Sequence, residues 1–330
     1  MSGDAVRIGF VPLVDCALLA VAQEKGFFAR YRIDAELRKA QSWGQVRDKL
    51  QARELDAAHL LITVPLQTAL EHPGEPPPLQ YAFTLSRNGN GIILSNALWN
   101  HGVRDAVGLS EWLDANPERP LRLGVVFPRG TQEYFLRSWL ARGKLALGDR
   151  ITLFIIPPQE MVGRLRKGEI DGFCVGEPWT RRATESKLGR LVAASASLLP
   201  GLGEKVLGVR AEWHREHAPE HMRVLRALSE ASEWMADAAN LEAAVEIVCS
   251  KRYVNTSKSV VDAALRDALG AQPQAPGAPA GIRSPVPAHA RWYLDQMALW
   301  GHATGGVCAA ADLDSICLDG FYRSGNFTVT

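Results

Sequence analysis

The chain has 330 residues, about the length of two ordinary domains. Hydrophobic residues make up 47% and charged residues 22%, which excludes a disordered chain, a collagen-like chain and a coiled coil. With 37 basic and 36 acidic side chains the net charge is +1, which argues against direct nucleic-acid binding through a general basic field. One well-placed cation can still bind a small anion.

The first residues do not have the pattern of an export signal. Residues 13–16 loosely resemble a lipoprotein cleavage box, but Asp15 puts a charge where a small residue is expected. The apolar segment 8–14 is barely long enough for a signal peptide, and no apolar run approaches the ~18 residues that a membrane helix needs. We therefore expect residues 6–13 to begin the mature fold, and the protein to be cytoplasmic without membrane contact.

Five scattered cysteines form no CxxC pair, and none has a His or Cys at metal-ligand spacing. The sequence thus predicts reduced thiols, no metal site and no cofactor. It also contains no nucleophile elbow, phosphate loop or HExxH motif. No catalytic residue is assigned, and the protein is not expected to be an enzyme.

Short apolar runs alternate with helical patterns along the first third of the chain. The predicted strands are 6–11, 33–37, 57–61, 80–85 and 91–95. Helices are predicted from Asp15 to Gly26 and over 45–52. This alternation indicates βαβ units and a mainly parallel sheet.

The middle of the chain repeats the alternation, and the last third is mainly helical. The predicted elements here are strands at 121–127, 151–156, 171–175 and 206–210 and helices at 131–142, 159–167, 220–238, 241–250, 259–269 and 290–302. A stretch rich in Pro, Ala and Gly at 272–287 is predicted to be a surface loop. No internal sequence repeat is evident.

Two α/β units and a helical C-terminal part predict a two-lobed binding fold with a ligand cleft. We place lobe I at residues 1–93 plus 205–330 and lobe II at 94–204, with the chain crossing between lobes near Ile93 and near Lys205. Composition and pattern alone do not name a ligand.

Seven motifs in a fixed order carry a family resemblance. The most specific pair is Phe-Cys-Val-Gly-Glu-Pro-Trp at 173–179, followed about thirty residues later by Glu-Lys-Val-Leu-Gly-Val-Arg at 204–210. The other motifs are at 23–28, 42–50, 88–92, 129–132 and 157–162. Over residues 6–325 the chain resembles the nitrate- and bicarbonate-binding proteins of ABC transporters, and more strongly the soluble nitrate/nitrite sensors of the NasS type.

The resemblance implies a type II periplasmic-binding-protein-like fold and a set of ligand-binding residues. They are Trp43, Asn90, Gly130, Thr131, Gln132, Pro158 and Lys205. Two of them depart from the transporter pattern, which usually has glutamine at the position of Asn90 and histidine at that of Gln132. The bicarbonate-binding branch has an acidic residue at the position of Lys205, which disfavours bicarbonate here, although amides in place of the histidine occur in that branch too.

This set suits a planar monoanion. Nitrate has three weak acceptor oxygens and no donor, so it needs a cation, neutral donors and a flat wall. Lys205 supplies the charge, Trp43 an indole N–H, and the Asn90 and Gln132 side chains amide donors. The backbone of Gly130 and the residues after it opens a helix, whose N-terminus favours anions.

Each residue by itself has a simpler explanation. Trp43 can be a packing residue, Asn90 a turn residue between two glycines, Gln132 a first-turn helix residue and Lys205 a solvated surface lysine. Only their joint fit to one binding pattern favours the functional interpretation.

Three functions follow from these expectations. The leading one is a cytoplasmic nitrate/nitrite sensor that sequesters an ANTAR-type RNA-binding antiterminator and releases it on anion binding, which regulates nitrate assimilation. The alternative is the substrate-binding protein of a nitrate or bicarbonate ABC transporter. The third is an enzyme, because a related fold serves in the synthesis of the thiamine pyrimidine, but the Cys- and His-rich segment typical of that enzyme is absent from the sequence.

Overall fold

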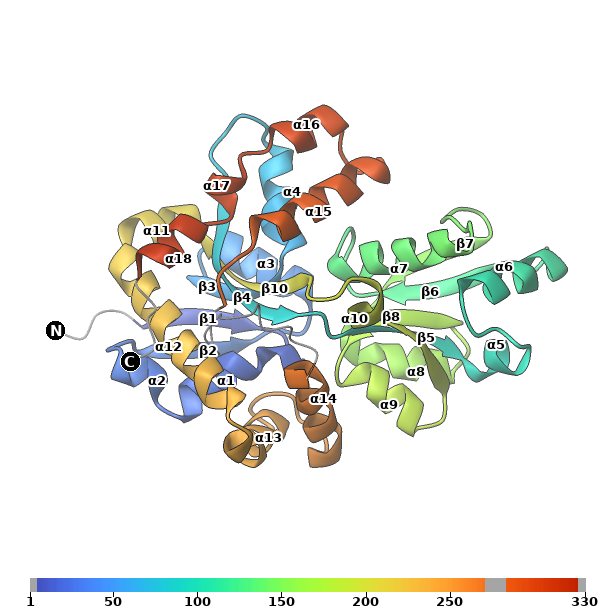
Figure 1. Cartoon of the computed structure of the whole chain (residues 1–330), viewed down its shortest axis with the longest axis horizontal. Helices are drawn as coiled ribbons and strands as arrows, with labels where there is room; N and C mark the ends of the chain where they lie inside the picture. Colours follow the sequence, from blue (N-terminus) through green and yellow to red (C-terminus); the bar gives the residue numbers. More distant parts are fainter. Residues whose placement is uncertain (1–4, 271–282, 326–330) are drawn as a thin grey trace. The chain divides into compact units, whose positions relative to one another are not determined.

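The computed structural model describes residues 5–270 and 283–325, and the chain divides into two compact units (Figure 1). The first unit comprises Met1–Arg87 and Gly201–Thr330, and the second is the continuous segment Asn88–Pro200. The chain passes from one unit to the other at 87/88 and 200/201, before the boundaries expected at 93/94 and 204/205. The expected boundaries would cut β5 (Asn90–Ser95) and β10 (Gly203–Arg210), each of which is an unbroken strand within one unit. Asn90 therefore belongs to the second unit rather than to lobe I.

The first unit is built on a five-stranded sheet of order β2-β1-β3-β10-β4. Strand β1 pairs in parallel with β2 and β3, whereas β10 is antiparallel to both β3 and β4. Four strands thus run in one direction and β10 runs against them. The bounds are β1 Val6–Phe10, β2 Ala35–Lys39, β3 Ala57–Leu61 and β4 Leu79–Arg87.

The second unit repeats this arrangement with a sheet of order β7-β6-β8-β5-β9. Strand β6 is parallel to β7 and β8, and β5, in the fourth position, is antiparallel to β8 and β9. The bounds are β6 Leu121–Val125, β7 Ile151–Ile155, β8 Gly172–Gly176 and β9 Gly189–Ala194. The expected mainly parallel sheets are confirmed, although β9 was not predicted.

Helices cover both faces of the first sheet. Figure 1 shows α1 and α12 on one face and α3, α4 and α15 on the other. The helices are η1 Val14–Cys16, α1 Ala17–Glu24, α2 Phe27–Arg30, α3 Trp43–Gln51, α4 Thr63–Glu71, α11 Ala211–Glu216, α12 Ala218–Ala236, η3 Ala238–Asn240, α13 Leu241–Cys249, α14 Lys258–Gly270, α15 Pro287–Leu299, α16 Gly305–Ala310, α17 Leu313–Ile316 and α18 Asp319–Ser324.

The core of the first unit follows from the sequence pattern of these helices. Helix α12 buries Val224, Leu225 and Leu228 at helical spacing, in one apolar cluster with α1 and the β1 residues Ile8 and Phe10. The helix predicted at 220–238 is thereby confirmed. It begins earlier, at Ala218, because a proline in the first turn lacks only an N–H that would have no helical partner.

In the second unit, α6 and α7 lie on one face of the sheet and α8 and α9 on the other (Figure 1). Leu109 and Leu113 of α6 and Leu136 and Leu140 of α7 pack with Leu123 of β6 in one buried cluster. The helices are α5 Asn96–Asn100, α6 Ala106–Ala115, α7 Thr131–Arg142, η2 Pro158–Glu160, α8 Met161–Arg166, α9 Trp179–Glu185 and α10 Ser195–Leu198.

Most of the Pro-rich stretch at 272–287 lies outside the described residues. Its described end is anchored rather than free. Arg283 is buried, its carbonyl accepts from the Thr84 N–H of β4 at 2.8 Å, and its Nε donates to Ser232 Oγ at 2.8 Å. The expectation of a surface loop is therefore wrong for Arg283. None of the helices in residues 5–270 and 283–325 is long and apolar enough to cross a membrane.

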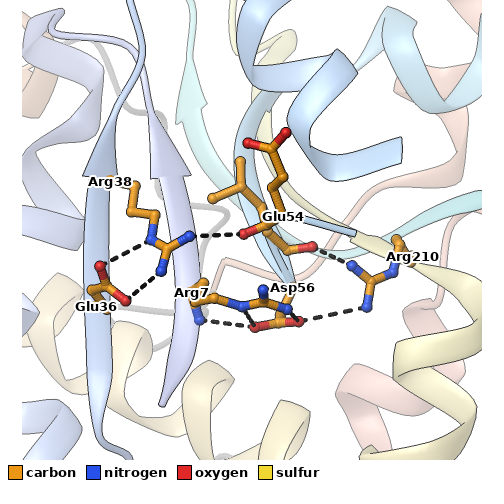
Figure 2. A network of polar contacts seen from close by, with 7 residues as sticks. Arg7, Glu36, Arg38, Glu54, Asp56 and Arg210 are labelled. Atoms are coloured by element: carbon orange, nitrogen blue, oxygen red, sulfur yellow. Dashed lines mark hydrogen bonds and ion pairs between the residues drawn. The ribbon is translucent and has the colours of Figure 1, made fainter. Parts of the chain in front are cut away.

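An arginine clamp closes the amino ends of the parallel strands in both units. In the first unit, the backbone N–H, Nε and Nη2 of Arg7 donate to the Asp56 carboxylate at 3.0, 2.9 and 2.8 Å, and Arg210 approaches the same carboxylate at 3.5 Å (Figure 2). Beside it, Arg38 binds Glu36 and the Glu54 carbonyl oxygen.

The second unit contains the same clamp. The backbone N–H, Nε and Nη2 of Arg122 donate to the Asp171 carboxylate at 2.9, 3.1 and 3.2 Å. The sequence separation is 49 residues in both clamps. The structure thus contains an internal repeat that the sequence alone does not reveal.

The two ends of the second unit are tied together. Asn88 lies two residues before β5, and its side-chain amide donates to the Leu199 carbonyl oxygen at 2.8 Å. Asn88 and Gly89 adopt left-handed backbone angles, with φ of 55° and 100°, so the chain turns sharply as it enters this unit.

Candidate functional site

Polar side chains gather at the carboxyl edge of the first sheet, opposite the Arg7–Asp56 clamp. Asp15 follows β1, His59 lies on β3, and Glu204 and Lys205 begin the reversed strand β10. Lys205 pairs with Leu61, the last residue of β3, so the start of β10 lies at this edge. In open α/β sheets this edge is the usual place for ligand binding.

Lys205 is a fully buried cation with two carboxylate partners. Its Nζ lies 2.8 Å from Glu204 Oε2 and 3.2 Å from Asp15 Oδ2, and the lysine side chain has no solvent exposure. Glu204 and Lys205 are neighbours on one strand and would ordinarily point to opposite faces. The pairing of β10 with β4 is irregular at Gly203, Lys205 and Val206, and such a bulge redirects side chains.

Asp15 bridges the lysine and a buried histidine. Asp15 Oδ1 lies 3.2 Å from His59 Nε2, while its Oδ2 faces Lys205. His59 is fully buried, and within the described ranges neither of its ring nitrogens completes a hydrogen bond of good geometry. The imidazole therefore has an acidic neighbour but unused hydrogen-bonding capacity.

Trp43 completes this group of polar side chains. It is the first residue of α3, whose N-cap Ser42 accepts from the Gln45 N–H at 3.1 Å, and the cap fixes where the helix begins. The Trp43 ring meets the His59 ring edge to face, with centroids 4.8 Å apart. Its indole Nε1 is buried and has no hydrogen-bond partner among the residues that the structure describes.

The ion pairs hold both ends of the Asp15–Lys205 contact charged. Burial by itself raises the pKa of Asp15, but the charge of Lys205 and the imidazole of His59 outweigh it and lower this pKa to about 2. Burial by itself lowers the pKa of Lys205, but Glu204 and Asp15 outweigh it and raise the value. A buried cation and carboxylate persist together because each satisfies the other.

The start of β10 is held in place by α15. The Gly203 N–H donates to His289 Nδ1 at 3.1 Å, and the Tyr293 hydroxyl donates to the Gly203 carbonyl oxygen at 3.2 Å. Burial lowers the pKa of His289 to about 4, with a smaller contribution from Arg87, so the ring stays neutral and can accept near neutral pH. These bonds fix the strand just before Lys205.

In the second unit, a chain of neutral hydrogen bonds takes the corresponding place. Asn90 begins the reversed strand β5, as Glu204 and Lys205 begin β10. Its Oδ1 accepts from Gln132 Nε2 at 3.1 Å, and Gln132 Oε1 accepts from the Thr131 hydroxyl at 3.1 Å. All three side chains are buried.

Thr131 and Gln132 open α7, and Gly130 is its N-cap without a side-chain cap. The first turn also contains buried Glu133, whose Oε2 accepts from the Arg129 N–H at 2.7 Å and whose Oε1 accepts from Arg137 at 2.8 Å. This carboxylate uses part of the favourable potential at the helix N-terminus.

The structure thus groups most of the residues expected to bind a ligand, each within its own unit. Trp43 and Lys205 belong to one cluster through His59 and Asp15, and Asn90, Thr131 and Gln132 form one hydrogen-bond chain. Gly130 precedes that chain as the N-cap of α7. Pro158 is buried at the start of η2, after β7.

Asp15, His59 and Glu204 are not among the residues that the sequence predicts for the site. Each left a signal: Asp15 follows a strand end, His59 is a titratable residue in the otherwise apolar strand Ala57–Leu61, and Glu204 precedes the assigned lysine. Their importance depends on β3 and β10 being paired, which a single sequence does not show.

Lys205 is not an isolated cation, because the carboxylates of Glu204 and Asp15 lie 2.8 and 3.2 Å from its Nζ. In residues 5–270 and 283–325, no group of three or more His, Cys, Asp or Glu side chains is arranged to hold a metal ion.

Two α/β units, each with a sheet of the same direction pattern and polar side chains at its carboxyl edge, define an α/β fold of the periplasmic-binding-protein type. Solved structures support this assignment. The chain superimposes on the periplasmic nitrate-binding protein NrtA from Synechocystis PCC 6803 with a TM-score of 0.85 and 27% identity, over 97% of this chain and 88% of that one.

The chain belongs to the NMT1-like family, whose model matches residues 2–250. It is 34% identical over 322 residues to the bicarbonate transport ATP-binding protein CmpC of Synechococcus elongatus, which covers 97% of this chain and 49% of that protein. It is 30% identical to the nitrate/nitrite binding protein NrtA of the same organism, over 96% of this chain and 76% of that one. The chain therefore spans about half the length of the ATP-binding relative.

Proposed function

We propose that the protein binds nitrate or nitrite and serves as the substrate-binding component of an ABC import system. The observation that carries the proposal is a fully buried Lys205 that is linked, through Asp15 and His59, to the buried Trp43. The indole N–H of Trp43 has no partner among the described residues. A buried polar hydrogen without a partner is costly, and a bound acceptor removes that cost. The names of the relatives, which include nitrate/nitrite and bicarbonate transport proteins, support the same ligand class.

Within the first unit, Lys205 and Trp43 offer a cation and an indole donor. Within the second unit, Asn90, Thr131 and Gln132 offer neutral hydrogen-bonding groups. The Gly130 backbone and Pro158 complete the set assigned from the resemblance. Micromolar binding corresponds to about 8 kcal/mol, which three charge-assisted hydrogen bonds reach at the upper end of about 1.5–3 kcal/mol each.

The proposal favours nitrate and nitrite over bicarbonate. Both nitrogen oxyanions only accept hydrogen bonds, and Lys205 and the Trp43 Nε1 only donate them. Bicarbonate also carries a hydroxyl that needs an acceptor. Neither Lys205 nor the Trp43 Nε1 offers an acceptor for that hydroxyl.

Isothermal titration of the purified protein with nitrate, nitrite and bicarbonate tests the assignment. We expect micromolar binding of nitrate or nitrite and at least tenfold weaker binding of bicarbonate. The Trp43→Phe variant keeps the ring and removes the N–H, and we expect it to weaken nitrate binding about tenfold. Trp234→Phe, on α12, is the matched control. Equal binding by Trp43→Phe and the wild type would contradict the assigned role of the indole.

The second candidate is a cytoplasmic nitrate/nitrite sensor that sequesters an ANTAR-type antiterminator and releases it on anion binding. The Asn90–Gln132 amide pair favours it, because the transporter pattern has glutamine and histidine at these positions. A co-purification assay with an ANTAR-domain protein, with and without nitrate, tests this candidate. A complex that nitrate dissociates supports the sensor. Stimulation of transport by the matching permease and ATPase supports the importer.

A further inference from the structure

We infer that the amino end of α4 is a further part of the anion site in the first unit. The Thr63 hydroxyl and the backbone N–H groups of Thr63 and Val64 donate hydrogen bonds to the oxygens of the bound oxyanion. The inference rests on the proposed function and deepens it, because it adds two residues that the expected ligand set does not contain.

The amino end of α4 lies at the carboxyl edge of the first sheet. Strand β3 ends at Leu61, which pairs with Lys205, and α4 begins two residues later at Thr63. Between them, the Ile62 N–H donates to the Glu204 carbonyl oxygen at 3.0 Å, which holds this turn against the start of β10. The end of α4 therefore belongs to the same edge as the lysine that the proposed function uses.

The first group at this end is the hydroxyl of Thr63. The residue is 0% exposed, and its Oγ1 has no hydrogen-bond partner in the part of the chain that the structure describes. In a helix each Cα–Cβ bond tilts toward the amino end, so the side chain of the first residue is directed toward that end of α4. A buried hydroxyl without a partner is costly and calls for an explanation, and an oxyanion that accepts from it supplies one.

Backbone N–H groups form the rest of this end. The first N–H groups of a helix have no acceptor within the helix. In α4 they belong to Thr63 and Val64, which are 0% and 1% exposed, whereas Pro65 at the third position has no N–H. The N-cap residue Ile62 offers them no side-chain acceptor. Three donors from two neighbouring residues thus need an acceptor from outside the helix.

Other helices of the molecule satisfy or neutralise this end with their own side chains. Ser42 caps α3, Asp105 caps α6, and Glu133 lies in the first turn of α7. Helix α4 has neither a side-chain cap nor an acidic residue in its first turn. Because the amino end of a helix carries a partial positive charge, the end of α4 favours a bound anion over a cation or a neutral ligand.

The donors of α4 complement the buried lysine. Lys205 Nζ already lies 2.8 Å from Glu204 and 3.2 Å from Asp15, so the lysine gives only part of its hydrogen-bonding capacity to a ligand. The first turn of α4 adds neutral donors without adding a carboxylate. Nitrate and nitrite present only acceptors, which is the chemistry that these donors require.

The Thr63→Val variant tests the hydroxyl, because valine keeps the branched shape and replaces the hydroxyl with a methyl group. By calorimetric titration with sodium nitrate, we expect the affinity to fall about tenfold. By differential scanning calorimetry without nitrate, we expect Tm to stay the same or to rise, because the variant breaks no hydrogen bond of Oγ1 within the described residues and a methyl group is better suited to burial. Thr63→Ser restores a hydroxyl and should recover most of the affinity.

Thr68→Val is the matched control on the same helix. Thr68 is also buried, but its hydroxyl donates to the Pro65 carbonyl oxygen at 2.9 Å. We expect this variant to have a lower Tm and unchanged nitrate affinity. The two threonines should thus respond in opposite ways, Thr63 in binding and Thr68 in stability.

Thr63→Cys gives a second variant in case Thr63→Val folds poorly. A thiol is similar in size to a hydroxyl but is a weak donor, so we expect the nitrate affinity to fall by about threefold or more. Wild-type affinity in Thr63→Val, or in Thr63→Cys where the valine variant does not fold, overturns the inference and leaves the proposed function intact.

Two further outcomes are decisive. A lower Tm in Thr63→Val together with weaker binding that Thr63→Ser does not recover shows that the hydroxyl has a structural role, and it overturns the inference. Wild-type protein that binds neither nitrate nor nitrite overturns the proposed function itself, and the inference with it.

Discussion

The carboxyl edges of the two sheets have the same strand arrangement but carry side chains of different chemistry. In each unit the reversed strand starts at this edge and carries a key polar residue there. This residue is Lys205, the third residue of β10, in the first unit and Asn90, the first residue of β5, in the second. The first unit surrounds its residue with carboxylates and an imidazole, and the second surrounds its residue with neutral amide and hydroxyl groups. The amino edges, by contrast, carry the same arginine clamp.

The contrast shows which parts of a repeated architecture are free to differ. The clamps join the first and third parallel strands of each sheet through identical donor atoms, which is a structural task. The carboxyl edges have no such shared task, and there the side chains carry charge in one unit and only dipoles in the other.

Removing the lysine should have the largest effect. Lys205→Gln leaves Asp15 and Glu204 buried without their cation, so we expect a loss of about 3–5 kcal/mol in the free energy of unfolding and no measurable nitrate binding. Urea unfolding and calorimetry measure the two effects. Adding Glu204→Gln to this variant should recover part of the stability. Lys167→Gln, on an exposed helix end, should change neither.

The corresponding change in the second unit should cost less. Gln132→Leu leaves Asn90 Oδ1 and the Thr131 hydroxyl without the partner each has in the structure, but no charge is left unbalanced. We expect a loss of about 1–3 kcal/mol in stability and of about tenfold in nitrate affinity. A loss as large as that of Lys205→Gln would break the distinction between a charged and a neutral edge.

Acid should act on the first unit through its buried imidazoles. Burial, and then His214, lower the pKa of His221 to about 3, below the ordinary value of 6.5. Between these values the unfolded chain binds the proton and the folded chain does not, so stability falls as the pH falls from 6.5 toward 3. From pH 7 to 5 this amounts to about 2 kcal/mol.

Differential scanning calorimetry of the wild type and His221→Phe at pH 7 and 5 measures this effect. We expect the wild type to lose several degrees in Tm and the variant to lose less. The amide pair of the second unit has no proton to gain over this range. Equal acid sensitivity of the two proteins would contradict the assignment of His221.

The smallest effect should come from the clamps. Arg7→Gln and Arg122→Gln each break a partly exposed ion pair, with arginine side chains 33% and 40% exposed. We expect a loss of about 1 kcal/mol or less from each, similar in the two units, and unchanged nitrate affinity. Clear loss of anion binding in either variant would show that the amino edges are not purely structural.

The hydrophobic pattern of the sequence predicts most helices and strands. It does not predict which strands pair, and the site depends on that pairing. Helix α7 has the bounds read from the sequence, Thr131–Arg142, because its apolar spacing and the preceding glycine mark it locally. Sequence pattern marks Asp15 as the start of a helix and as a charge that disfavours a cleavage box, but not as part of a ligand site. Its contacts with His59 and Lys205 depend on the order of β1, β3 and β10 in the sheet.

Charge compensation was the other property that the sequence did not reveal. Lys205 was expected to act as a single cation, but the bulge at the start of β10 turns the neighbouring Glu204 toward it. A bulge depends on how β10 meets β4, and no residue pattern within 203–210 predicts it. The amide pair is easier to predict, because Asn90 and Gln132 lie in the family motifs at 88–92 and 129–132.

The bond between Asn88 and Leu199 has a consequence for engineering. It holds the first and the next-to-last residue of the second unit close together, so this unit is an insertion whose two ends are neighbours. In the first unit, the residues that flank the insertion are themselves neighbours, since Arg87 at the end of β4 pairs with Gly203 at the start of β10. Deleting the second unit and joining β4 to β10 through an Asn-Gly turn would give a simple β-hairpin. Each half of the molecule could then be produced, titrated and redesigned on its own.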